Sequence, residues 1–282
     1  MNTYAMNLCD VFPAVQRCGA LEMMCSEMEQ KYGNRLTTIY IGSYFCSQMF
    51  LKLTGLVSEE TMAFCTRNGI SVNLTVPIFS QKDLENGKAA IRKLLTTGNN
   101  PITEITVNDI AMMHYVHETF PELNLFAGRL FQRTLRDMRY PDEKPQSACL
   151  SDLVQPDILQ RIEAGILQGV EFDGIAAHIK DDIQKQKLIL VDHEPYSYMT
   201  TGNICEYASI RQPIEKKFRP NTICGMECQE IYIQYRINPN LSMMKIGRAV
   251  YFETAGVNLD GDTYVRHLLF PLEHVAKLLH QQ

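Results

Sequence analysis

The feature that most constrains the fold is an alternation of strand-like and helix-like segments between residues 36 and 140. Strand and helix patterns follow one another at 36–46, 58–69, 71–80, 84–95, 102–109, 110–120 and 123–130. Strands that are joined by helices run parallel with right-handed crossovers. No GxGxxG motif follows the first strand, so a dinucleotide-binding fold has no support. The pattern therefore predicts a TIM-barrel-like α/β barrel, which could be incomplete or distorted.

Other segments extend this prediction along the chain. Helices are predicted at 13–33, 131–140, 156–169 and 272–282, and strand-like pieces at 174–179, 187–199, 230–237, 245–256 and 263–270. Ser58 and Asp109, or its neighbour Asn108, are predicted helix N-caps, and Gly33 a helix end. A chain of 282 residues with 45% hydrophobic content suits a single domain over residues 1–282.

The composition excludes some classes of function. A net charge of −5 argues against a nucleic-acid-coating protein, although it allows a local basic patch. The N-terminal residues lack the pattern of a signal peptide. No apolar run approaches the roughly 18–20 residues that span a bilayer. We expect a cytoplasmic protein without a membrane span.

Nine cysteines occur in the chain, and an odd number fits poorly with a disulfide framework. In a reducing cytosol they are expected to be thiols. Five of them have no ligand-like neighbour and are predicted to be small buried apolar residues. These five are Cys9, Cys18, Cys25, Cys65 and Cys149.

The remaining four cysteines form a candidate metal or cluster site. Cys205, Cys224 and Cys228 are separated by 18 and then three residues, within loops at about 200–230, and Cys46 follows the first predicted strand. Because working residues of a parallel barrel lie at the carboxyl ends of its strands, all four thiols could meet at one mouth. An all-cysteine set suits an iron–sulfur cluster or zinc, and we favour the cluster. The alternative is four unrelated buried thiols.

Four arginines recur at helical spacing, at Arg129, Arg133, Arg136 and Arg139. A solvated helix face is the simpler interpretation. The alternative is an anion site, because guanidinium groups bind carboxylates and phosphates in bidentate fashion. Arg129 is nearest to a strand end and is the candidate anion-binding residue. The other three could face RNA or a partner subunit.

Two further sets of polar residues have mainly structural interpretations. His193 and Glu194 lie in a strand-like run, where they could flank a cluster, but a satisfied buried histidine is commoner. His114 and His117 share a helix without an obvious third metal ligand, so they are expected to be structural or surface residues.

The chain resembles peptidase family U-32, the collagenase-like family, and in particular its small iron–sulfur members typified by UbiV. The resemblance covers about residues 36–235. It rests on IYIGSYFCSQ with Cys46, on the later cysteines in order and nearly in spacing, and on ITVNDIAMMHYV and LNLFAGRLFQRTLRDMRYP. Ala127 stands where the family pattern has a second asparagine.

The resemblance implies a barrel that holds a 4Fe–4S cluster on Cys46, Cys205, Cys224 and Cys228. It implies a component of an oxygen-independent hydroxylation of a quinone precursor or an RNA base, with a small anion such as prephenate as oxygen donor and a homologous subunit as partner. The alternative is a non-catalytic partner or scaffold with a structural iron–sulfur or zinc site. A peptidase is less favoured, because no nucleophile–base set or HExxH motif is present.

Overall fold

The protein is described by a computed structural model that covers most of the chain. The described residues are 3–96, 100–133, 147–173, 178–179, 187–210, 212–219, 224–238, 241–253 and 265–271, together with 273, 275 and 277.

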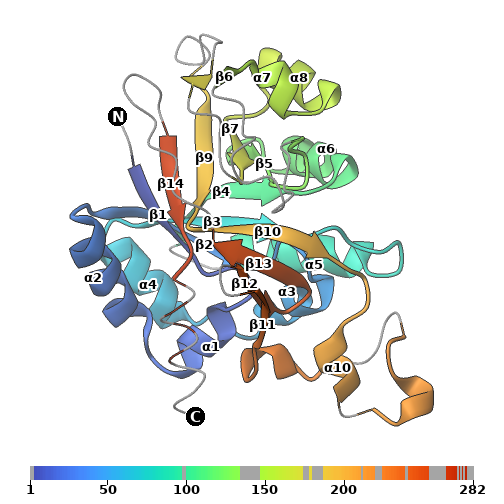
Figure 1. Cartoon of the computed structure of the whole chain (residues 1–282). Coiled ribbons are helices and arrows are strands. Elements are labelled where there is room, and N and C mark those ends of the chain that lie inside the picture. The colour runs from blue at the N-terminus through green and yellow to red at the C-terminus, as the bar shows by residue number, and fades with distance from the viewer. Residues whose placement is uncertain are drawn as a thin grey trace.

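Eight parallel strands close into a barrel, as the strand–helix alternation predicts (Figure 1). In order around the barrel they are β1 (Thr3–Asn7), β14 (Val265–Leu269), β9 (Ile189–Glu194), β7 (Gly169–Phe172), β5 (Asn124–Ala127), β4 (Ile102–Val107), β3 (Ser71–Val76) and β2 (Leu36–Gly42). The predicted fold class is confirmed. The sequence patterns missed β1, which pairs with both β2 and β14 and so closes the barrel.

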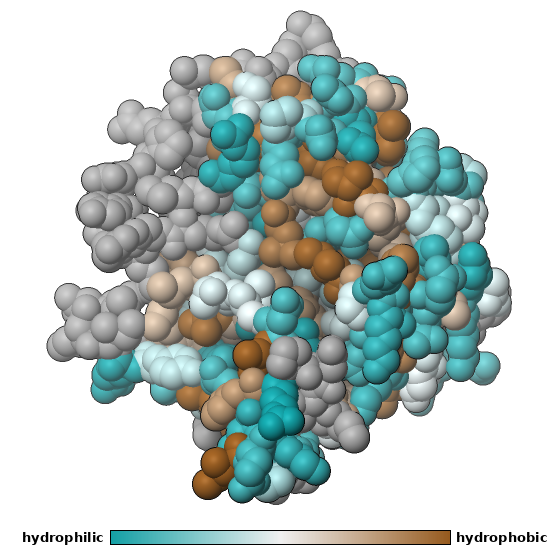
Figure 2. Space-filling model, turned by 90° about the vertical axis from the view of Figure 1, so that its right-hand side faces the viewer, coloured by the Kyte–Doolittle hydropathy of each residue, from teal (hydrophilic) through white to brown (hydrophobic). Residues whose placement is uncertain are grey.

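Helices cover the outside of the barrel and connect its strands. They are α1 (Phe12–Arg17), α2 (Leu21–Tyr32), α3 (Ser47–Leu53), α4 (Glu59–Arg67), α5 (Leu84–Leu95), α6 (Ile110–Thr119), α7 (Leu150–Leu153) and α8 (Pro156–Glu163). Figure 2 shows that the surface over one side of this layer is largely hydrophilic, with hydrophobic residues between the hydrophilic ridges. No helix in the described part of the chain is long and apolar enough to cross a membrane.

Several predicted helix boundaries are confirmed by their caps. The Ser58 side chain accepts a hydrogen bond from the Thr61 backbone, and Asp109 accepts one from Met112, as N-caps do. Gly33 ends α2 with a φ of 66°, a left-handed conformation that glycine adopts without a steric penalty.

Other predicted helix boundaries were wrong. The single helix predicted at 13–33 is two helices, because the chain turns at Cys18–Ala20 between α1 and α2. The helix predicted at 156–169 ends at Glu163, and Gly169 begins β7. Residues 131–133 are not helical, since Gln132 forms an isolated bridge with Val154. The rest of the helix predicted at 131–140 lies outside the described residues.

A second sheet is inserted between β9 and β14, and the sequence patterns did not separate it from the barrel. It has four antiparallel strands in the order β10 (Tyr196–Thr201), β13 (Ala249–Glu253), β12 (Leu241–Ile246) and β11 (Ile233–Asn238). Its loops carry α10 (Glu206–Ile210) and the short 3₁₀ helices η1 (Ile214–Lys216) and η2 (Glu227–Gln229). A further pair of short strands, β6 (Ser147–Ala148) and β8 (His178–Ile179), lies outside both sheets.

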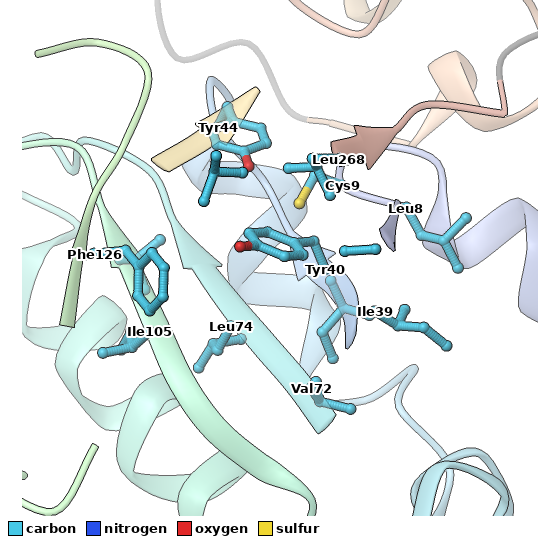
Figure 3. Packing of buried hydrophobic residues seen from close by; sticks show 14 of the residues in the cluster. Leu8, Cys9, Ile39, Tyr40, Tyr44, Val72, Leu74, Ile105, Phe126 and Leu268 are labelled. Atoms are coloured by element: carbon cyan, nitrogen blue, oxygen red, sulfur yellow. The ribbon is translucent and has the colours of Figure 1, made fainter. Parts of the chain in front are cut away.

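The barrel interior combines apolar residues with ionisable ones. Figure 3 shows Phe126 in the same buried cluster as Tyr40 and Tyr44, whereas Leu74 and Ile105 lie on the opposite face of their strands from the interior residues Asn73 and Glu104. Arg266 on β14 makes two hydrogen bonds to Glu104 on β4, at 2.6 and 2.9 Å. These strands are opposite each other in the order of the barrel, so the ion pair crosses its interior. Paired charges of this kind satisfy the polar groups that the core buries.

Candidate metal centre at the barrel mouth

Cys46 is held at the carboxyl end of β2 by a tight turn. Gly42 begins the turn with a φ of 121°, and a Cβ there would lie 2.1 Å from the Thr75 carbonyl oxygen. The Ser43 hydroxyl then accepts a hydrogen bond from the Cys46 backbone at 2.8 Å. Cys46 precedes α3, and a hydrogen bond from the Met49 backbone acts on its thiol. Burial nevertheless raises the pKa of Cys46 to about 12.

The other three cysteines belong to the inserted sheet rather than to barrel strands. Cys205 follows β10 and precedes α10, whereas Cys224 and Cys228 lie in the segment before β11. The sequence prediction that placed all four thiols at barrel strand ends is therefore corrected for these three. They reach the barrel because the insertion folds back over its mouth.

Two buried hydrogen bonds and an exposed one attach this insertion to the barrel. The Gln229 side chain donates to the Asp10 carbonyl at 2.7 Å and accepts from the Ala14 backbone at 3.2 Å. Lys52 on α3 donates to the Cys224 carbonyl at 2.6 Å. These contacts join positions more than 170 residues apart in the sequence, and they bring the Cys224–Cys228 segment toward Cys46.

The four predicted ligand thiols lie in one electrostatic neighbourhood. Burial is the main reason that the pKa of Cys228 is raised, and Cys46, Cys224 and Cys205 each raise it further. Cys224 likewise acts on Cys46, and Cys205 acts on Cys224. The structure thus places the other three thiols within electrostatic range of Cys228. It does not arrange them as ligands: among the described residues, no three His, Cys, Asp or Glu side chains are placed to hold one metal ion.

The thiols also have donors of the kind that stabilise ligand sulfur atoms. The Met226 backbone donates to the Cys224 sulfur at 3.4 Å, and the Gln229 amide donates to the Cys228 sulfur at 3.6 Å. Burial raises the pKa of Cys224, and the Met226 hydrogen bond and the Lys52 charge offset only part of that rise. Such donors and nearby cations tune metal-bound thiolates. The chemistry of the donors, but not the placement of the four sulfur atoms, therefore fits a thiolate-ligated metal or cluster.

The other five cysteines divide differently from the prediction. Cys9, Cys25 and Cys65 are buried, as expected. Cys18 is exposed, because it lies in the turn between α1 and α2, and Cys149 is partly exposed at the start of α7. The apolar interpretation was wrong for these two.

Arg129 is completely buried and does not belong to a solvated helix face. It lies just after β5 and forms a bidentate ion pair with Asp173, which follows β7; one of the two hydrogen bonds, from Nε, measures 3.0 Å. The carboxylate bound to Arg129 in the structure is thus an internal one. Arg133 is exposed, and Arg136 and Arg139 lie outside the described residues.

Four aromatic rings surround the Arg129 guanidinium carbon. Their centroids lie at 4.9 Å for Tyr198, 5.3 Å for Tyr44, 5.9 Å for Tyr251 and 6.0 Å for Phe45. Tyr198 and Tyr251 come from the inserted sheet, whereas Tyr44 and Phe45 follow β2. Cation–π contacts of this kind help to hold the insertion over the barrel mouth.

The remaining predicted polar residues have structural partners. His193 is buried and lies 3.0 Å from the Glu171 carboxyl, and Glu194 pairs with His267 at 2.7 Å. Asn108 is buried and donates to the Val76 carbonyl. His114 and His117 line a surface cavity of about 320 Å³ beside α8, and His114 pairs with the exposed Glu118.

Sequence reasoning missed a group of buried ionisable residues beneath the insertion: Asp10, Tyr44, Glu171 and Asp173. Asp10 and Asp173 each follow a barrel strand, which is the one signal that could have identified them. Glu171 lies inside β7, where it accepts a hydrogen bond from Thr106 at 2.7 Å. Burial raises the pKa of Glu171 to about 7 and that of Asp10 to about 6.

The raised pKa of Glu171 predicts a pH-dependent stability. The folded protein binds the Glu171 proton more tightly than the unfolded chain does. The contribution of Glu171 to the free energy of unfolding is therefore complete at low pH and is lost as the pH rises toward and through about 7. Glu171→Gln removes the ionisable group but not the neighbours that also titrate. We compare the free energies of unfolding of the variant and the wild type by urea titration. The difference in favour of the variant should grow by roughly 2–3 kcal/mol from about pH 5 to pH 8. A difference in unfolding free energy that stays constant across this pH range would contradict the raised pKa of Glu171.

Comparison with known proteins gives no match: no protein-family model, no curated protein and no solved structure matches the chain. The resemblance to peptidase family U-32 therefore stays a prediction.

Proposed function

We propose that the chain binds a 4Fe–4S cluster through Cys46, Cys205, Cys224 and Cys228 and serves as the iron–sulfur component of an oxygen-independent hydroxylation. The observation that supports this proposal most is that Cys46, which follows a barrel strand, and Cys205 and Cys224, which lie in the insertion, all act electrostatically on Cys228. The substrate class, a quinone precursor or an RNA base, rests on the family resemblance, as do prephenate as oxygen donor and a homologous partner subunit.

A bound cluster would supply one-electron transfer at the barrel mouth. The residues of the chain would position and tune the ligands. The Met226 backbone and the Gln229 amide donate toward two of the sulfur atoms, and Lys52 places a cation beside Cys224. The inserted sheet covers this end of the barrel and limits the access of water, which strengthens these interactions.

Metal analysis of the protein purified without oxygen tests the proposal. We expect about four iron and four sulfide ions per chain and a brown protein, because four thiolates complete the ligand set of one cubane cluster. Replacing Cys224 or Cys228 by serine should reduce the iron to less than about one per chain. Cys65→Ala is the matched control, because Cys65 is a buried thiol outside the site.

A colourless wild-type protein that stays free of iron after reconstitution would contradict the proposal. So would a Cys65→Ala variant that loses as much iron as Cys224→Ser, since the loss would then reflect general unfolding.

A second candidate is a scaffold in which the thiols hold a structural iron–sulfur or zinc centre. It is favoured by the hydrogen bonds of Gln229 and Lys52, because a metal bound beside them would strengthen the same attachment of the insertion to the barrel. Tight zinc binding without iron, together with a stable complex with a homologous subunit, would support this candidate over the first.

A further inference from the structure

The insertion carries most of the large hydrophobic side chains that the protein exposes. In the described part of the chain eight such side chains are exposed, and six of them lie between residues 199 and 231. They are Met199, Ile204, Ile210, Ile214, Phe218 and Ile231. Single exposed apolar residues are normal, but a group of them on one segment marks an interaction surface. This part of the insertion is therefore a candidate contact surface.

The Ser209 hydroxyl brings three of these residues together. It donates to the Cys205 carbonyl at 3.0 Å and accepts from the Phe218 backbone at 3.0 Å. Ile204 precedes Cys205, and Ile210 follows Ser209. Because consecutive Cα atoms are about 3.8 Å apart, the backbones of both isoleucines lie near that of Phe218. The exposed side chains thus form one group at the end of the insertion.

Phe218 has a strained backbone and gains no burial from it. Its φ is 54°, in the left-handed region that bulky residues rarely adopt, yet the residue is 58% exposed. Ile214 is 83% exposed, and its carbonyl accepts a hydrogen bond from the Lys217 backbone at 3.2 Å, which turns the chain toward Phe218. Backbone strain of this kind is concentrated at functional sites. The segment thus presents Ile214 and Phe218 to the outside of the protein.

Positive charges accompany these two apolar side chains. They are Lys216, Lys217 and Arg219, with one carboxylate, Glu215, before them. This segment is therefore positive in a chain whose net charge is −5. Lysine is depleted in protein–protein interfaces. Apolar side chains beside lysine and arginine are instead typical of segments that bind lipid surfaces, where the apolar groups enter the acyl boundary and the cations meet anionic headgroups.

Figure 1 shows α10 and the described residues after it at the lower right, where they project away from the barrel. A projecting segment reaches a flat surface before the rest of the molecule does. We propose that residues 204–210 and 212–219 dock on an anionic lipid surface, with Ile214 and Phe218 inserted and Lys216 and Lys217 at the headgroups. Docking does not depend on a bound cluster, so the proposal goes beyond the proposed function.

Co-sedimentation of the full-length protein with vesicles tests the proposal. Vesicles of equal parts phosphatidylcholine and phosphatidylglycerol are compared with vesicles of phosphatidylcholine alone. We expect partitioning into the anionic vesicles to be at least about tenfold stronger, because each lysine or arginine near such a surface contributes a factor of about five. Raising the salt concentration to about 0.5 M should remove most of this preference, because salt screens the attraction.

Phe218→Asn removes the apolar ring with little risk to folding, because asparagine tolerates a positive φ. We expect a melting temperature at least equal to that of the wild type and a loss of vesicle binding of about tenfold, since the variant has less apolar surface to insert. Met23→Gln is the matched control. Met23 on α2 is 50% exposed but lies outside the insertion, so its replacement should leave vesicle binding unchanged.

Lys216→Gln tests the contribution of charge. It should weaken binding to the anionic vesicles about fivefold and leave binding to phosphatidylcholine vesicles unchanged. Lys82→Gln is its control, because Lys82 is an exposed lysine outside the insertion. The control variant should bind both kinds of vesicle as the wild type does.

Three outcomes would overturn the proposal. The first is equal partitioning of the wild type into anionic and neutral vesicles, and the second is an equal loss of binding in Phe218→Asn and Met23→Gln. The third is a wild-type oligomer in size-exclusion chromatography that Phe218→Asn dissociates without a change in vesicle binding, which would assign the surface to a second copy of the chain. Iron content is measured on the same samples, so cluster binding and lipid binding remain separate results.

Discussion

Replacing Asp173 by alanine is expected to destabilise the protein by about 3–5 kcal/mol, because it leaves the Arg129 charge buried without its partner. The Arg129 side chain is fully buried, and the Asp173 carboxyl is the group to which its Nε and Nη2 atoms donate. The same carboxyl accepts hydrogen bonds from Gln132 and from the Tyr198 backbone, so the substitution removes a junction between barrel and insertion. The free energy of unfolding, from urea titration, measures the effect.

Asp157→Ala is the control for the loss of an aspartate. Asp157 is exposed in the first turn of α8, where a carboxylate contributes at most about 1 kcal/mol through the helix dipole. If Asp173→Ala costs no more than this control, Arg129 must find another partner or water, and the account of a buried ion pair would be wrong.

Local patterns were sufficient to predict the helical layer and most of the barrel. The caps at Ser58 and Asp109 and the αL glycine at Gly33 are fixed by neighbours in sequence, so they are readable without a fold. Strand β1 was missed because only five residues form it and it is stabilised by β14, at the other end of the chain. Its register depends on closure of the barrel, which a local pattern does not contain.

In the candidate site, too, local sequence predicted some features, whereas others depend on the fold. The cysteines were selected by their chemistry and spacing, but their location on an inserted antiparallel sheet was not predicted, because strand patterns do not reveal which sheet a strand joins. Arg129 was selected for a helical spacing that the structure does not show at 131–133. Its partner Asp173 is 44 residues away, and only the barrel brings them together.

A single substitution at Glu104 is expected to cost about 3–5 kcal/mol, whereas the double variant Glu104→Leu/Arg266→Met should recover most of that loss. Glu104→Leu leaves the Arg266 guanidinium in the barrel interior, against the rings of Tyr40 and Phe126, without its carboxylate. Exchanging both charges for apolar side chains removes the unpaired charge and keeps a filled interior. Urea unfolding of the wild type, both single variants and the double variant gives the coupling energy.

The exposed pair of Glu85 and Lys88 provides the comparison, at an N···O distance of 2.8 Å that is close to the 2.6 Å of the buried pair. Because solvent screens the exposed pair, its coupling energy should be much smaller than that of the buried pair. Equal coupling energies for the two pairs would mean that the interior pair is hydrated. A large coupling for Glu104 and Arg266 alone would show that burial, rather than the distance between the charged atoms, makes this pair important to a closed barrel.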